Sequence, residues 1–147
     1  MRFLAILLIV FCSFGLAKGQ SSKDNGQFLI DRFFEIYQSK GAEEASKFVF
    51  ASNKWMSVES DEVKNMIFEL TKTVNLVGNY IGYEELRSLP VTSRFRAVSY
   101  FVYYDRQPLR FTFQLYKNSE GWMFWNFRFD TSYDDEMDEF MKLSNKK

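Results

Sequence analysis

The sequence is most informative over residues 94–130, which read RFRAVSYFVYYDRQPLRFTFQLYKNSEGWMFWNFRFD. Between Leu109 and Tyr116, apolar and polar residues alternate with a period of two, a pattern typical of a strand with one buried face. Turn-forming residues precede and follow this strand, at 105–108 and 117–121. Residues 94–130 therefore predict three consecutive antiparallel strands.

The loop lengths predict the register of these strands. A four-residue loop at 105–108 pairs Tyr104 with Leu109, and a five-residue loop at 117–121 pairs Phe113 with Trp125. The core face is then expected to carry Val98, Tyr100, Val102, Tyr104, Leu109, Phe111, Phe113, Leu115, Met123, Trp125, Phe127 and Phe129. The outer face is expected to carry Phe95, Phe101, Tyr103, Arg110, Thr112, Gln114, Tyr116, Trp122, Phe124 and Arg128.

Upstream of the sheet the apolar residues follow a helical period. They predict helices from Gln27 to about Gly41, from Glu43 to about residue 52, and from about residue 60 to about residue 75, with Ser60 and Asp61 as N-cap candidates. A first strand is expected at 76–83, with 88–93 as a connection. The fold class predicted is α+β, with three N-terminal helices packed on one face of a curved four-stranded antiparallel sheet.

The two ends of the chain predict targeting and a tail. Residues 1–19 combine an early Arg, an apolar run and small residues before Gly19, as in a secretory signal peptide. The apolar run, Phe3 to Leu16, is shorter than the roughly 20 residues of a membrane span. We expect export after cleavage behind Gly19, a flexible lead at 20–26, a domain at 27–130 and an acidic, then basic, tail at 131–147 that forms a short helix.

The composition excludes several chemistries. The chain has no His, and its one Cys, Cys12, leaves with the signal peptide, so Ser–His–Asp and Cys–His sites, the usual zinc sites and disulfides are not expected. The glycine-rich phosphate-binding motifs are absent, and no cofactor is expected. Removing residues 1–19 takes away Arg2 and Lys18 but no acid, so the net charge falls from zero to −2, which argues against nucleic-acid binding.

Carboxylates are the remaining candidate catalysts, and each has a simpler interpretation. Asp31 and Glu35 share a polar helix face, Glu84 and Glu85 lie at a strand end, and Asp130 is expected to pair with a neighbouring Arg. The acidic run at 134–139 lacks the spacing of a calcium loop. No catalytic or metal-binding residue is therefore assigned.

The element order, the Gly121-Trp122 hairpin and the Arg128-Phe-Asp130 strand end resemble the nuclear-transport-factor-2-like (NTF2-like, cystatin-like α+β) superfamily, in particular small secreted bacterial members. The resemblance covers residues 27–130. It implies a cone-shaped interior that in enzymes of the superfamily holds an Asp with a Tyr or His. It also implies a sheet face that often forms a two-fold dimer. The superfamily contains enzymes, binding proteins and structural domains.

Two sets of candidate site residues follow. An apolar pocket is expected to be lined by Phe34, Tyr37, Trp55, Met56, Phe113 and Trp125. An interface on the outer sheet face is expected to include Phe101, Tyr103, Arg110, Tyr116, Trp122 and Phe124.

The function predicted is that of a non-enzymatic, exported binding or assembly module. Its expected partners are a second copy or another protein at the outer sheet face, and a small apolar ligand. The alternatives are an NTF2-like isomerase or dehydratase that moves a proton between Asp and Tyr, and a peptide-binding, inhibitor-like domain. A filled interior beneath an aromatic outer face favours assembly.

Overall fold

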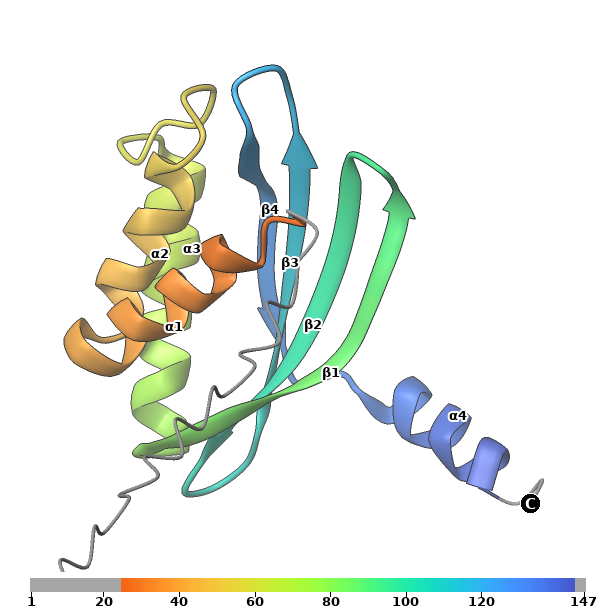
Figure 1. Ribbon diagram of the computed structural model, residues 1–147. Helices are drawn as coiled ribbons and strands as arrows, with labels where there is room; N and C mark the ends of the chain where they lie inside the picture. Colours follow the sequence, from red (N-terminus) through yellow and green to blue (C-terminus); the bar gives the residue numbers. More distant parts are fainter. Residues whose placement is uncertain (1–24, 145–147) are drawn as a thin grey trace, which may run out of the picture.

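In the computed structural model, which describes residues 25–144, the chain forms a curved, four-stranded antiparallel sheet with helices before and after it (Figure 1). The elements in chain order are α1 Gln27–Lys40, α2 Ala42–Ala51, α3 Asp61–Val77, β1 Tyr80–Thr92, β2 Phe95–Tyr104, β3 Leu109–Lys117, β4 Trp122–Asp130 and α4 Asp134–Ser144. Each strand pairs with the next one in the chain. The predicted α+β class is confirmed.

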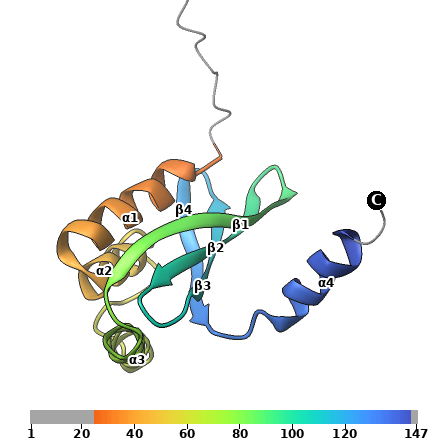
Figure 2. The same cartoon turned by 90° about the horizontal axis from the view of Figure 1, so that it is seen from below.

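The helices occupy opposite sides of the sheet. α1, α2 and α3 lie on one side, and α4 stands beyond the other, as both views show (Figures 1 and 2). We call the sheet face toward α1–α3 the inner face and the opposite face the outer face. The outer face therefore receives no cover from the three N-terminal helices.

Local signals in the sequence position the helix ends. α1 ends at Gly41, which has φ 88° and whose N–H donates to the carbonyl of Tyr37 at 3.0 Å. α3 starts after Ser60, whose Oγ accepts from the backbone N–H of Val63 at 3.4 Å, with two acids in the first turn. Of the two N-cap candidates in the sequence, Ser60 and Asp61, Ser60 is the N-cap.

The turn between α3 and β1 is bonded to the turn between β2 and β3. Gly78 has φ 97°, and a Cβ there would lie 2.8 Å from the Cβ of Asp105. The Asp105 carboxylate accepts from the backbone and side-chain amides of Asn79 at 2.8 and 2.9 Å. This close approach fixes the end of α3 against one end of the sheet.

The expected first strand was placed too early in the chain. α3 continues to Val77, and β1 runs through residues 88–92, which were expected to be a connection. β1 has register irregularities near Gly82, Leu86 and Val91, which break the period of two that identifies a strand in a sequence. Pro90 is tolerated because β1 is an edge strand.

The pairing of β2 with β3 is offset by two residues from the expected register. Leu109 lies opposite Val102, not Tyr104, and Phe111 lies opposite Tyr100. Since side chains alternate with a period of two, this offset leaves each of them on its expected face. The side chains buried beneath the helices include Val98, Tyr100, Val102 and Tyr104, as predicted.

The expected faces of β4 are wrong in the first half of the strand. Phe124 pairs with Leu115 and Asn126 pairs with Gln114. Trp125, between them, has no cross-strand partner. This bulge reverses the alternation. Trp122 and Phe124, expected outside, lie on the inner face, while Trp125, expected in the core, is 50% exposed.

After the bulge the alternation of β4 agrees with the prediction. Phe127 lies opposite Phe113, and Phe129 lies opposite Phe111, so both belong to the inner face. Arg128 lies opposite Thr112 on the outer face. The pairing itself differs from the expected one, in which Phe113 faced Trp125.

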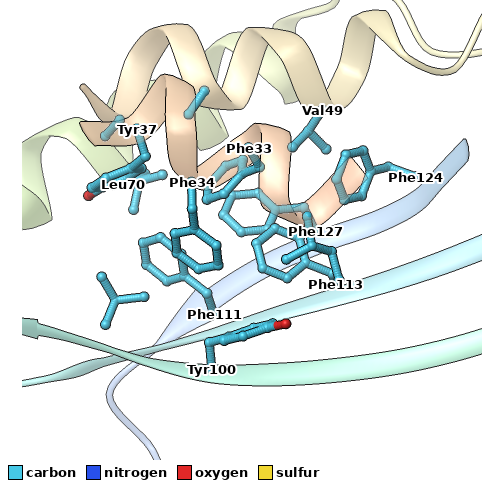
Figure 3. Close-up of a cluster of buried hydrophobic side chains, with 14 of the residues drawn as sticks. Phe33, Phe34, Tyr37, Val49, Leu70, Tyr100, Phe111, Phe113, Phe124 and Phe127 are labelled. Atoms are coloured by element: carbon cyan, nitrogen blue, oxygen red, sulfur yellow. The ribbon is translucent and has the colours of Figure 1, made fainter. Parts of the chain in front are cut away.

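The core is a layer of aromatic rings between α1 and the sheet (Figure 3). The ring of Phe33 lies 4.9 Å from that of Phe113 and 5.4 Å from that of Phe127, and Phe34 meets Tyr100 at 5.1 Å. The edge-to-face pairs Phe33–Phe113 and Phe34–Tyr100 each add about 0.5–1.5 kcal/mol to the burial of their apolar area.

The bulge in β4 predicts a contrast between two adjacent aromatic residues. Phe124→Ala is expected to lower the free energy of unfolding by about 3–5 kcal/mol, because it leaves a cavity in the core. Trp125→Ala is expected to cost about 1 kcal/mol or less, because Trp125 is half exposed. Urea denaturation measures both. A loss for Trp125→Ala that exceeds the loss for Phe124→Ala would contradict the face assignment.

Candidate functional site

The interior expected to form a pocket is filled by side chains. Phe34, Tyr37 and Phe113 are 1%, 4% and 0% exposed and belong to the aromatic core. Phe34 also stacks on Tyr83 of β1 with ring centroids 3.6 Å apart. These three pocket candidates are brought together, but as mutually packed core residues.

The other three pocket candidates lie apart from them. Trp55, after α2, is 76% exposed, with the Lys54 ammonium 5.5 Å from its ring. Met56 is partly buried against the core, and Trp125 lies on the outer sheet face. The six residues therefore do not line one cavity.

A cluster of tyrosines closes the core beside the end of α1. The hydroxyl groups of Tyr37 and Tyr104 share a short hydrogen bond, and the Tyr80 ring lies 5.4 Å from that of Tyr37. The Gln38 amide donates to the Tyr80 hydroxyl at 3.3 Å. Burial raises the pKa of Tyr37 to about 12, and burial together with the neighbouring Tyr37 raises the pKa of Tyr104.

Within residues 25–144, a carboxylate accepts a tyrosine hydrogen bond at one place. Tyr103 donates to Glu84 at 2.9 Å on the outer face, where both side chains are accessible to solvent. The phenols of Tyr37 and Tyr104, which the core shields from water, bond to each other instead. An Asp–Tyr proton-transfer pair would need a carboxylate beside a shielded phenol.

A groove of about 680 Å³ opens between α1, α2 and α3, on the side of the helices. Its apolar lining includes Ile36, Phe48, Val58, Ile67 and Phe68. Its charged residues are Lys40, Glu43, Glu44, Lys47, Glu59 and Lys64. Lys47 lies 2.8 Å from both Glu43 and Glu44, and Lys64 lies 2.9 Å from Glu59. An apolar floor with a charge-balanced rim suits a mostly apolar ligand.

The outer sheet face combines aromatic rings with arginines. Four interface candidates, Phe101, Tyr103, Arg110 and Tyr116, lie on it as predicted. Trp125 joins them through the bulge, and its ring meets that of Tyr116 at 6.1 Å. The remaining two candidates belong to the inner face, as described above.

An ion pair connects the start of β3 with the end of β4 on this face. Arg110 of β3 lies 2.9 Å from Asp130 of β4, and the two side chains are 13% and 28% exposed. Asp130 thus pairs with an Arg, as predicted, and its partner lies on the neighbouring strand. A partly buried pair is screened less by salt than an exposed one.

The remaining carboxylates do not assemble into a site within the described chain. Asp31 accepts from Gln27 at 3.0 Å, whereas Glu35 pairs with Arg32 at 2.8 Å, and these bonds are exposed. No group of three or more His, Cys, Asp or Glu suited to a metal ion occurs among residues 25–144.

The fold and these surfaces define a small α+β domain with a packed interior and two accessible apolar surfaces, the helical groove and the outer sheet face. No family model, characterised protein or solved structure matches the chain. Between residues 25 and 144, no helix has the length and apolar character that crossing a membrane requires.

Sequence reasoning missed the groove and the exposed position of Trp125. Phe68 falls off the apolar stripe of α3 and is 63% exposed, and an unmatched aromatic residue of this kind is the signal that points to the groove. No comparable signal announces the bulge at Trp125, because a bulge depends on pairing between strands.

The buried phenols predict loss of stability at alkaline pH. An unfolded Tyr has a pKa near 10, whereas that of folded Tyr37 is about 12. As pH rises from about 10 to about 12, the unfolded chain releases protons that the folded chain keeps, so the free energy of unfolding falls. Below about pH 9, the buried phenols are expected to cause no such decline in the free energy of unfolding.

Urea midpoints measured from pH 8 to 12 test this expectation. The control is Tyr37→Phe/Tyr104→Phe, which removes both phenols together and leaves neither without its partner. Its decline between pH 10 and 12 should be shallower. Equal slopes for the two proteins would contradict the assignment of the pKa shifts.

Proposed function

We propose that the mature chain is a non-enzymatic, exported binding or assembly module of the NTF2-like type, and that its outer sheet face binds a second copy. One observation carries this proposal: α1, α2 and α3 leave this aromatic face uncovered (Figure 2). On this face Trp125 is 50% exposed beside the partly buried ring of Tyr116, and accessible aromatic surface often marks an interaction site.

The composition of the face supports this proposal. Tyr, Trp and Arg are enriched at the centres of protein interfaces, and Tyr116, Trp125 and Arg128 all lie here. The Arg110–Asp130 pair provides a polar border that already satisfies its own charges. A two-fold arrangement would place the same residues of both copies against each other.

The packed interior argues against the enzyme alternative. An NTF2-like isomerase or dehydratase needs space for its substrate beside a shielded acid, and here the rings of Phe33, Phe113 and Phe127 occupy that region. The alternative of a peptide-binding, inhibitor-like domain would use the free edge of β1. Pro90 and the bulges of β1 hinder the addition of a further strand there.

Export is part of the proposal and rests on the sequence alone. The predicted signal peptide and the lead at 20–26 lie almost entirely outside the described residues. A domain without disulfides would depend on its aromatic core for stability after export.

The proposed interface predicts a dimer that a single charge weakens. Light scattering of the 20–147 chain is expected to give the mass of a dimer. Trp125→Glu is expected to weaken association roughly 30-fold, which is the effect of losing an interface hot spot of about 2 kcal/mol.

The matched control is Trp55→Glu, because Trp55 is also exposed but lies after α2, on the helical side. This variant should dimerise like the parent chain. A monomeric parent chain, or equal weakening by both substitutions, would overturn the proposed interface.

The groove between the helices favours a second candidate function, the binding of a small apolar ligand. Its volume of about 680 Å³ falls within the range typical of ligand sites. The folded 20–147 chain is expected to enhance the fluorescence of an anilinonaphthalene sulfonate dye. Phe68→Glu should reduce this enhancement, because it puts a charge on an exposed apolar wall.

The control for the dye experiment is Leu76→Glu, at a position on the same helix that is 60% exposed and does not line the groove. It should leave the fluorescence unchanged. An equal reduction by both variants would show that the dye does not report the groove.

A further inference from the structure

Helix α4 exposes an apolar stripe. Met137, Phe140 and Met141 recur at helical spacing and are 39%, 40% and 64% exposed. An 11-residue helix is marginal by itself in water, because most helical stability in proteins comes from packing an apolar face. The stripe therefore calls for a surface that covers it.

Contacts with its own chain turn the stripe away from its own sheet. Glu139 lies 2.7 Å from Arg87 of β1. Glu139 follows Met137 by two positions, which places it about 200° away around the helix. The side of α4 that carries Glu139 is thus held toward β1, and the helical spacing places Met137 on the opposite side of the helix.

The start of α4 is also fixed. Only residues 131–133 separate it from β4, and the Tyr133 ring packs edge-on against Phe101 with centroids 5.2 Å apart. To lay its stripe on its own outer face, α4 would have to break the Arg87–Glu139 pair and rotate by about half a turn.

The outer sheet face has the charge that complements α4. Asp134 and Asp138 lie beside the stripe, one helical turn apart. On the sheet, the Arg128 side chain is exposed and makes no ion pair or hydrogen bond within the part of the chain that the structure describes. Trp125 supplies an apolar contact on the same face.

We propose that α4 of one copy packs its apolar stripe across the outer sheet face of a second copy, with its acids directed at the Arg128 side chain of that copy. The exchange is reciprocal, so each copy donates one helix and receives one. The inference rests on the proposed function and deepens it, since it names the element that covers the outer face.

A second copy fits α4 better than a lipid surface does. Helices that lie on membranes usually carry Lys and Arg on the polar face, and anionic headgroups repel acids. The residues described on α4 include Asp134, Asp135, Asp138 and Glu139 but one base, Lys142.

Disulfide trapping between two single-cysteine proteins tests the exchange. The 20–147 chain has no Cys, so Phe140→Cys on α4 and Asn126→Cys on the outer face introduce one thiol each. An equal mixture under mild oxidation should form the mixed 140–126 dimer. Its rate should exceed that of a control mixture of Phe140→Cys and Lys72→Cys by roughly tenfold or more, because a complex raises the effective concentration of the thiols.

Lys72 is a suitable control because its side chain is exposed on α3, on the other side of the sheet. Three results would overturn the exchange: a 140–140 dimer as the main product, a rate equal to the control, or a bond formed only within one chain by the Phe140→Cys/Asn126→Cys double variant.

Light scattering of the unmodified 20–147 chain distinguishes the proposed interface from the proposed exchange of α4. A dimer that Trp125→Glu weakens, but that shows no 140–126 trapping, would overturn the exchange of α4 and leave the outer face as the interface. A monomeric chain would overturn both the interface and the exchange.

Discussion

Phe33 lies at the point where α1 meets the sheet, and its ring packs against those of Phe111, Phe113 and Phe127 at centroid distances of 6.1, 4.9 and 5.4 Å. Residues 20–147 contain no cysteine, so the domain has no disulfide to support this packing. Because the rings interlock, the position of α1 fixes the curvature and the inner face of the sheet. α2 and α3 lie next to α1, and the groove lies between the three helices.

The same packing fills the interior and leaves only the surface accessible to a ligand or partner. A protein interior packed at crystal-like density leaves no room for a ligand, and the side chains that fill it stabilise the fold. Accessible apolar surface gathers in the groove between the helices and on the outer sheet face with α4, while single exposed residues such as Trp55 and Leu76 lie outside both. These surfaces present aromatic rings and charged side chains, which agrees with the proposed role in association.

The sequence predicted the element order and the core faces of β2 and β3, because local periodicity carries that information. The two-residue offset between Val102 and Leu109 was harmless, since an even offset preserves the faces. The bulges of β1 and the contact between Arg87 and Glu139 depend on residues far apart in the chain. Neither the full extent of β1 nor the orientation of α4 could therefore be derived from local pattern.

The bulge at Trp125 links the core to the proposed interface. Without the extra residue, uninterrupted alternation from Phe127 would turn Trp125 inward and Phe124 outward, and the core would have to hold an indole in place of a phenyl ring. With it, Phe124 fills the core at 0% exposure and Trp125 reaches solvent beside Tyr116. One inserted position thus serves packing and surface chemistry together. Bulges are often found where a strand must redirect a side chain for function, and this one supplies the largest side chain of the outer face.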